Sequence, residues 1–441
     1  MRRVFVVAFF FVLLLVPAPS RALNATAEGP ITLEEAISFA LKKSPVVESG
    51  RWDVVSKREG VKAAWGKHLP QVDLESGYTR FSDPLAVVPI KGFGRRPPFF
   101  SKNIYQWKAV GYLPVYQGGR ISRMVEISRL EEEIGADQLK LTKEELVADV
   151  TNLFNRVLQL NHLLKAQEDA LGALQKVRED THNLLKVGRV AQVDLMRIDT
   201  QVSVQKQELI ATRELLRRTK ETLAYLLGWP PRAELNPVGE LREVPFDAKP
   251  AVDAVERRPD VRAALKRVEE AQKRIEYEFG AHLPDLYLST SYGDRSGAGF
   301  HGKEEVWQAG AYLRLNIFSG GTISAKVRQA KAELFKARSQ LQNARLKAEE
   351  EILHASSAVA EARAKVEAAR LALQSAKESF RVERLKYASG AGTVTDMLLA
   401  QAQWLDSKAR YYQALYDENS AVVAYKLATS SILEDGGEEL K

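Results

Sequence analysis

The sequence predicts a mainly α-helical protein that also carries strand hairpins and is built from one unit used twice. Three observations predict this fold. Two long stretches, from Gly118 to Gly228 and from Gly320 to the C-terminus, contain no proline. Several sequence features recur at a constant spacing. Within each copy, the spacing of apolar residues changes from two, typical of strands, to about three and a half, typical of packed helices.

An internal repeat fixes the architecture before any local prediction. Pro45 recurs as Pro259, an offset of 214 residues, and Gly118 recurs as Gly320, an offset of 202. We expect a first repeat over 23–228, a proline-rich linker over 229–250, a second repeat over 251–435 and a C-terminal tail over 436–441. The other recurring pairs are His68 and His282, Gly188 and Gly390, Asp194 and Asp396, and Gln201 and Gln403.

The first 22 residues have the pattern of a signal peptide. Arg2 and Arg3 precede an apolar run from Val4 to Val16, and small residues follow before Ala22. The alternative, a membrane anchor, needs roughly 20 apolar residues, and this run is shorter. We therefore expect an exported chain that is cleaved after Ala22.

Composition excludes several classes of function. The formal charge of +7 falls to about +4 without Arg2, Arg3 and Arg21, and the remaining Lys and Glu are interleaved, so we expect no nucleic-acid partner. The chain has no cysteine, which excludes disulfides and thiolate metal sites. The six histidines show no metal-ligand spacing, and no catalytic motif is present, so we expect no metal, no cofactor and no enzyme.

Each repeat should begin with short helices. Thr32 can cap the first, and Ser44 is a good N-cap for a second helix that starts at Pro45 and continues to about Lys67. In the second repeat, Pro259 starts a helix that continues to about residue 281.

Alternating apolar and polar residues then predict one strand hairpin in each repeat. The strands are expected over about 70–82 and 104–117 in the first, and 284–293 and 305–318 in the second. The proline- and glycine-rich segment over 83–103 is expected to be irregular.

Long helices follow, over about 118–187 and 320–388. Each contains roughly 70 residues, which corresponds to about 105 Å. Their apolar residues step by four and three, as in a coiled-coil seam. The shorter helices before each hairpin, together with those after each long helix, sum to nearly the same length, so they can lie end to end along it.

Four strands cannot close into a barrel, which needs at least about eight. Closure therefore requires an oligomer, and three chains would supply twelve strands. The alternative is a small soluble sheet packed on the helix ends. Asp73, Glu75, Lys108, Arg314 and Asn316, on the polar face, favour a watery lumen instead.

These features resemble the TolC-like family of outer-membrane efflux proteins. The resemblance rests on the duplicated order of elements, on the Gly-Gly pair opening each long helix, and on a glycine six residues before an aspartate at each helical turn. It implies a homotrimer with a 12-stranded β-barrel in the outer membrane, set on a 12-helix tunnel that reaches into the periplasm. A periplasmic adaptor and an inner-membrane transporter would be its partners in efflux or type I secretion. The alternative interpretations are a periplasmic adaptor or a coiled-coil scaffold.

The resemblance also assigns candidate site residues. Asp194 and Asp396 match acidic positions at the pore entrance; alternatively, each caps its helix. A second carboxylate one helical turn later is absent, since Arg197 and Leu399 hold those positions. The periplasmic tip that contacts the adaptor would comprise Val187, Gly188, Arg189, Ser389, Gly390 and Ala391.

Overall fold

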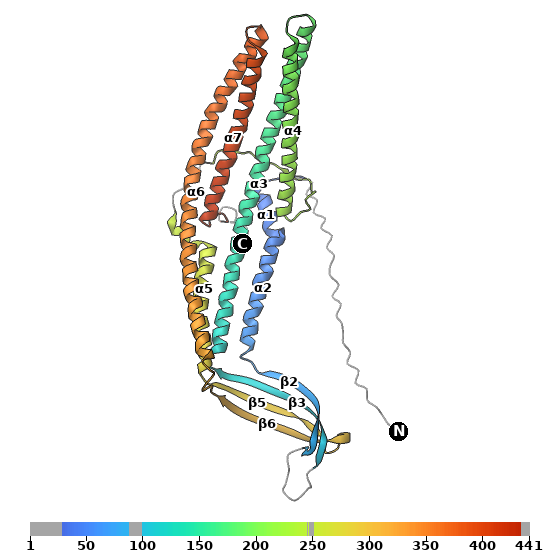
Figure 1. The fold of residues 1–441 in the computed structure, drawn as a ribbon, viewed down its shortest axis with the longest axis vertical. Coiled ribbons are helices and arrows are strands. Elements are labelled where there is room, and N and C mark those ends of the chain that lie inside the picture. Colours follow the sequence, from blue (N-terminus) through green and yellow to red (C-terminus); the bar gives the residue numbers. More distant parts are fainter. Residues whose placement is uncertain (1–28, 88–98, 245, 247–250, 434–441) are drawn as a thin grey trace, which may run out of the picture.

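The protein forms an elongated helical body with a β-sheet at one end and two helical hairpins at the other (Figure 1). This computed structural model describes residues 29–87, 99–244, 246 and 251–433. The expected signal peptide, its cleavage site and the 436–441 tail lie outside the described residues.

Both repeats follow the same order of helix, hairpin, long helix and helix. The first contains α1 (Leu33–Lys43), α2 (Pro45–Gly66), β2 (Gln71–Ala86), β3 (Phe100–Gln117), α3 (Arg120–Lys186) and α4 (Gln192–Leu226). The second contains η1 (Val252–Arg257), α5 (Pro259–Phe279), η2 (Gly280–His282), β5 (Asp285–Ser296), η3 (Ala298–Phe300), β6 (Glu304–Arg314), α6 (Thr322–Ser389) and α7 (Val394–Ala428).

The two long helices organise the body. Helix α3 has 67 residues and α6 has 68. Helices α2 and α4 follow one another along α3, and α5 and α7 follow one another along α6 (Figure 1). Helix α3 also packs against α5 and α7, which joins the two repeats.

The predicted seams form the core. In α3, Leu146, Val150, Val157 and Leu160 are buried in one apolar cluster with residues of α1, α4 and α7. The seam of α6 is rich in alanine, which lets neighbouring helices approach closely. Its buried members are Ala337, Leu341, Ala348, Ile352, Ala355, Val359, Ala362 and Val366.

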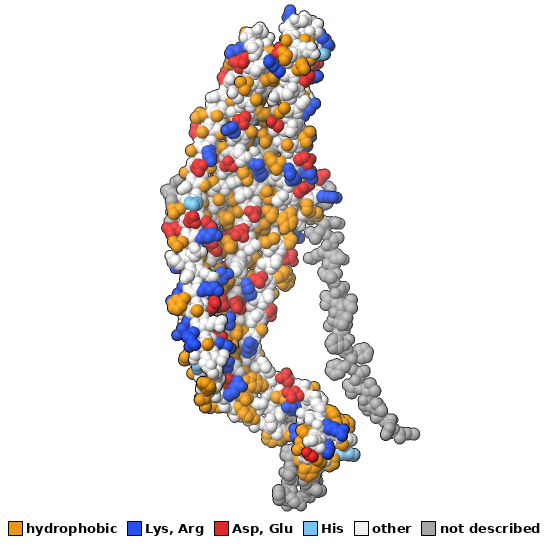
Figure 2. Space-filling model, in the orientation of Figure 1, with side chains coloured by type: hydrophobic (Ala, Val, Ile, Leu, Met, Phe, Trp, Pro, Cys, Tyr) orange, Lys and Arg blue, Asp and Glu red, His pale blue; other side chains and the backbone are white. Residues whose placement is uncertain are grey.

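The connection between the repeats crosses the body and packs on it. Trp229, Leu235 and Leu241 are buried in the α3 cluster. β1 (Pro30–Ile31) pairs in parallel with β4 (Asn236–Pro237), so the linker also holds the chain just before α1. The charged side chains of the body are of both signs and are intermixed, as the sequence indicates (Figure 2).

The two helix starts predicted at Thr32 and Ser44 are both present, but only Thr32 makes the expected capping hydrogen bond. The Thr32 hydroxyl accepts a hydrogen bond from the Glu35 N–H at 3.3 Å, and the Glu35 carboxylate accepts one from the Thr32 N–H at 2.9 Å, which completes a capping box. Ser44 precedes Pro45 as predicted, but its side chain makes no capping hydrogen bond. The fixed φ of Pro45 starts α2 without that bond.

The hairpins form one antiparallel sheet with the order β2-β3-β5-β6. Its register aligns Leu74, Ala109, Tyr292 and Trp307 across the four strands. Because side chains alternate along a strand, the predicted apolar residues that pair in this regular register lie on one face. On the other face Lys108 forms an ion pair with Glu75, with 2.8 Å between nitrogen and oxygen.

The strand ends differ from the prediction. The irregular segment expected over 83–103 is shorter, because β2 continues to Ala86 and β3 starts at Phe100. Pro84 is tolerated because β2 is an edge strand and its register shifts between Arg80 and Leu85. The expected strand over 305–318 ends at Arg314, whose partner Asp285 is the first residue of β5, so residues beyond Arg314 have no strand to pair with.

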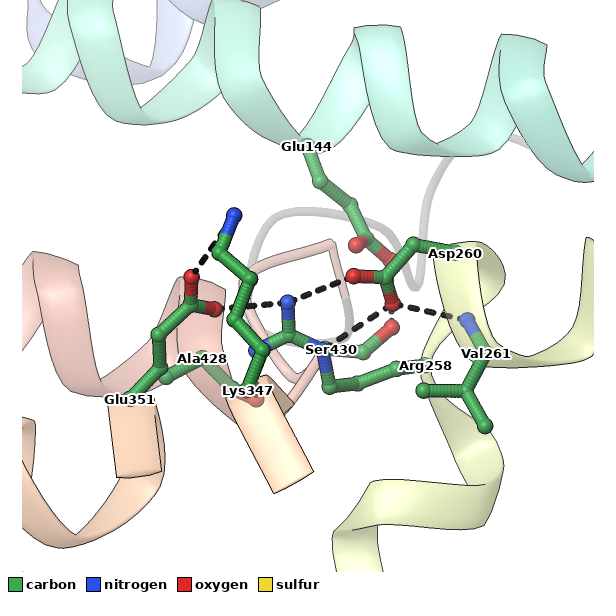
Figure 3. A network of polar contacts seen from close by, with 8 residues as sticks. All are labelled: Glu144, Arg258, Asp260, Val261, Lys347, Glu351, Ala428 and Ser430. Atoms are coloured by element: carbon green, nitrogen blue, oxygen red, sulfur yellow. Dashed lines mark hydrogen bonds and ion pairs between the residues drawn. The ribbon is translucent and has the colours of Figure 1, made fainter. Parts of the chain in front are cut away.

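A polar network ties the helices of the second repeat together where α5 begins (Figure 3). Arg258, at the start of α5, donates to both carboxylate oxygens of Asp260, at 3.0 and 2.7 Å, and pairs with Glu351 of α6 at 2.7 Å. It also donates to the Ala428 carbonyl at the end of α7, at 3.2 Å. One buried guanidinium therefore connects α5, α6 and α7.

A neighbouring contact joins this network to the first repeat. Glu144 of α3 is buried and accepts a hydrogen bond from the Ser430 hydroxyl at 2.6 Å. Ser430 adopts a positive φ of 55°, as Gly228 does (φ 75°) at the equivalent position of the first repeat. The serine accepts this unfavourable backbone conformation and supplies a hydroxyl that the glycine lacks.

We predict that Asp260→Asn lowers the free energy of unfolding by about 2 kcal/mol at neutral pH, since charge-assisted hydrogen bonds to Arg258 are lost. Burial opposes ionisation of Asp260, but Arg258 outweighs it, and the pKa of Asp260 lies below its usual range. Asp260 therefore contributes stability above the ordinary carboxyl pKa of about 3.9, and that stability is lost as the pH falls through the lower folded pKa.

Thermal unfolding followed by circular dichroism at several pH values would measure this difference. The control is Asp253→Asn, because Asp253 is exposed and its ion pair with Arg257 is 3.8 Å long. Equal losses in both variants would contradict a special role for the Arg258 network.

Candidate functional site: the helical tips and pore entrance

The two chain reversals at the end of the body have the same backbone design. Gly188 (φ 70°) lies in the turn between α3 and α4, and Gly390 (φ 78°) lies in the turn between α6 and α7. The N–H of Gly188 donates to the Leu185 carbonyl at 3.0 Å, and that of Gly390 donates to the Tyr387 carbonyl at 3.1 Å. Only glycine adopts this left-handed conformation without steric cost, so both turns need it.

The tip residues that the sequence singles out are exposed. Val187 keeps 68% of its surface accessible, although it is apolar. Arg189 and Ala391 are exposed as well. Ser389 differs from Val187 because its hydroxyl donates to the Lys386 carbonyl at 3.0 Å and serves the helix end. Only the first turn therefore presents an apolar side chain at this position.

The two aspartates lie in equivalent places with different surroundings. Each is in the first turn of its helix, Asp194 in α4 and Asp396 in α7. Asp194 is partly buried and its carboxylate lies 3.6 Å from the Arg197 guanidinium. Asp396 is exposed and accepts a hydrogen bond from the Thr393 hydroxyl at 2.6 Å.

Neither aspartate occupies an N-cap position. Thr393 is the N-cap of α7 and accepts the Asp396 N–H at 3.1 Å, whereas Ala191 at the start of α4 offers no side-chain acceptor. Both carboxylates lie in the first turn of their helices, near the positive ends of the helix dipoles, where a negative charge interacts favourably with the backbone. Both carboxylates therefore lie next to the turns, and neither serves as the N-cap of its helix.

Two further contacts, which the sequence does not identify, link the hairpins near the tips. Arg197 of α4 donates to the Thr395 hydroxyl of α7 at 3.0 Å. The hydroxyls of Thr181 in α3 and Tyr387 in α6 are 2.9 Å apart. The spacing of three between Asp194 and Arg197 indicates their pairing, but no sequence signal joins Arg197 to a residue of the other repeat.

An apolar cluster supports these contacts. Leu174, Ile198, Val202, Val394 and Met397 are buried together and come from α3, α4 and α7. The first turns of α4 and α7 are therefore held against α3. This apolar packing fixes the positions of the two aspartates. Among the residues that the structure describes, no group of three or more His, Asp or Glu could hold a metal ion.

Comparison with known proteins identifies the family. A sequence profile described as outer membrane efflux protein matches residues 36–229 and 251–429. The chain therefore belongs to the outer membrane efflux protein family, as its TolC-like features indicate. It is accordingly a protein of the outer membrane that extends into the periplasm, and its family and fold are those of transport channels rather than enzymes. No described helix has the length and hydropathy needed to span a bilayer.

Relatives match at low identity. The probable efflux pump outer membrane protein TtgC of Pseudomonas putida is 26% identical over 226 residues, 49% of this chain and 46% of that protein. The chain thus matches less than half the length of that relative. Nodulation protein T of Rhizobium leguminosarum bv. trifolii is 25% identical over 90% of this chain and 84% of that protein. The outer membrane protein VceC of Vibrio cholerae shares the fold, with a TM-score of 0.76, 18% identity and coverage of 90% and 95%.

We predict that Gly390→Ala destabilises the tip by about 1 to 2 kcal/mol, because alanine resists a positive φ. No atom lies within 4 Å of a Cβ added there, so the cost comes from the backbone alone. Gly60→Ala in α2 is the matched control, since Gly60 also has open space but a helical φ, and it should stabilise by about 0.5 kcal/mol. Thermal unfolding compares the two; destabilisation by both would contradict this account.

Proposed function

We propose that three copies of this chain form a closed channel-tunnel. The observation that supports this proposal most strongly is that the sheet is open. Its two edge strands, β2 and β6, each have one side that pairs with no other strand of the described chain. Exposed strand edges are a liability that closure removes, and three chains of four strands give a 12-stranded barrel.

The surface of the sheet supports a membrane location for that barrel. The apolar face carries Leu74, Trp307 and Leu313, which are 76%, 73% and 71% exposed in the single chain. Near the hairpin loops this face carries aromatic residues, including Tyr78, Tyr105 and Trp107. Aliphatic residues flanked by aromatic ones match a surface that contacts lipid. The opposite face, with the Glu75–Lys108 ion pair, suits a watery lumen.

The helical body also exposes large apolar side chains in the single chain. Trp52 and Trp65 of α2, Ile210 of α4, and Phe335 and Leu346 of α6 are all more than half exposed in the single chain. Association of three copies would cover such residues and complete a 12-helix tunnel. Helix α3, with 67 residues, is about 100 Å long and spans a large part of the periplasm.

At the tips, the same trimer brings three copies of Asp194 and three of Asp396 near one axis. We propose that this ring of six carboxylates favours cations at the pore entrance. Arg197 lies beside Asp194 and partly offsets its charge, so Asp396 carries the larger share of the selectivity. Release of the Arg197–Thr395 contact would accompany opening of the entrance.

We further propose that the turns dock a periplasmic adaptor, through Val187, Gly188 and Arg189 in the first turn and Ser389, Gly390 and Ala391 in the second. The channel would then be a passive conduit for substrates that an inner-membrane transporter delivers, in efflux or in type I secretion. The relative TtgC is described as a probable efflux pump outer membrane protein, which supports this arrangement. Exposed Val187 makes the first turn the stronger docking surface.

Disulfide trapping tests the trimer, and the absence of native cysteine makes it free of background. Glu75→Cys in β2 is combined in turn with a cysteine at each alternate residue of β6 from Val306 to Tyr312. If β2 of one chain pairs with β6 of the next, one combination should give a covalent trimer under oxidising conditions. Glu75→Cys alone should give none. Absence of covalent trimers in the whole series would overturn the proposed closure.

The carboxylate ring is tested by conductance. Asp194→Asn combined with Asp396→Asn should lower the preference for cations in planar bilayers, because the substitutions remove charge and keep side-chain size. Asp253→Asn, far from the tips, is the control. Unchanged ion selectivity in the double variant would remove the aspartates from the pore entrance.

A further inference from the structure

A pocket of about 210 Å³, partly open to solvent, lies within one chain and is lined by residues of α3, α4 and α7. Its lining is unusual for a helical core because four glutamines contribute to it. They are Gln167 of α3, Gln201 and Gln205 of α4, and Gln401 of α7. Gln401 donates to the Ala170 carbonyl at 3.3 Å, but the other buried amides lack comparable partners.

Two buried polar atoms in this lining have no hydrogen-bond partner. They are the Oε1 atom of Gln167, a side chain 7% exposed, and the Nε2 atom of Gln205, a side chain 2% exposed. A buried amide left without a partner is costly, so such atoms usually bind something.

The chemistry of these two atoms selects the ligand. The Gln167 oxygen needs a donor, whereas the Gln205 nitrogen needs an acceptor. A cation would serve the Gln167 oxygen and the exposed carboxylates of Glu208 and Asp406, which also line the pocket, but not the Gln205 nitrogen; an anion would serve only that nitrogen. Water donates and accepts, so it satisfies both atoms, and a polar pocket of this volume has room for several water molecules.

The pocket lies between two apolar clusters of the helical body. On one side lies the tip cluster around Leu174 and Ile198; on the other lies the long core cluster that includes Leu160 and Leu216. The glutamines therefore interrupt the apolar packing between the tip and the body. Wet contacts between amides rearrange more readily than interdigitated apolar side chains.

We propose that this cavity holds bound water and forms a hydrated joint, about which the tip segments of α4 and α7 move relative to α3. The joint lies inside one chain, so it does not depend on the proposed trimer. It places the moving segment between the cavity and the turns at Gly188 and Gly390.

A high-resolution experimental structure of the full chain tests the water directly. The expected result is ordered water bonded to Gln167 Oε1 and Gln205 Nε2. A dry cavity, or a direct hydrogen bond between the two amides, would overturn the proposal.

Amide hydrogen exchange tests the joint. Gln167→Leu combined with Gln205→Leu should expel the water, and exchange in the first three turns of α4 should slow by about tenfold. Gln403→Leu is the control, because Gln403 is exposed on α7 and does not line the cavity. Unchanged exchange in a folded double variant contradicts the joint; if that variant does not fold, the water measurement decides.

Discussion

The length of α3 and α6 constrains everything else in this molecule. A helix of 67 or 68 residues with an apolar seam must be covered along its whole length, and the helices that pack along α3 and α6, namely α2, α4, α5 and α7, have 35 residues or fewer. Shorter helices stacked end to end provide that cover. The stacking creates a junction in the middle of the body, and the buried Arg258 network lies at this junction in the second repeat. The polar residues there join helix ends that an apolar core would leave unsatisfied.

The tips show how a duplicated sequence yields an asymmetric site. Both turns use a glycine with positive φ, and both aspartates follow at the same distance. Their neighbours differ, because Arg197 takes the place that Leu399 holds in the other repeat. One carboxylate is therefore near a cation and the other is bound to a hydroxyl. This difference lets one hairpin hold the other through Arg197 and Thr395.

Much of the fold is readable from the sequence because it depends on local signals. Pro45 and Pro259 start helices, glycines end them, and the seam of α3 follows its apolar spacing. Strand ends are less readable, since the end of β6 depends on where β5 begins and not on the alternation up to Ile317. In the site, the turns and aspartates follow from the repeat. Arg197–Thr395, Thr181–Tyr387 and the glutamine cavity depend on contacts between distant segments, which a single sequence does not reveal.

The two open edges of the sheet also bear on the order in which this protein assembles. Contacts along the helical hairpins are local and form quickly, whereas the pairing of β3 with β5 closes a loop of more than a hundred residues. A newly folded chain therefore has folded helical hairpins and an open sheet, whose apolar face and two edge strands, β2 and β6, are exposed. Such a sheet is prone to aggregation until other strands cover it. If three chains close the sheet as proposed, the rate of that closure depends on the concentration of the chain.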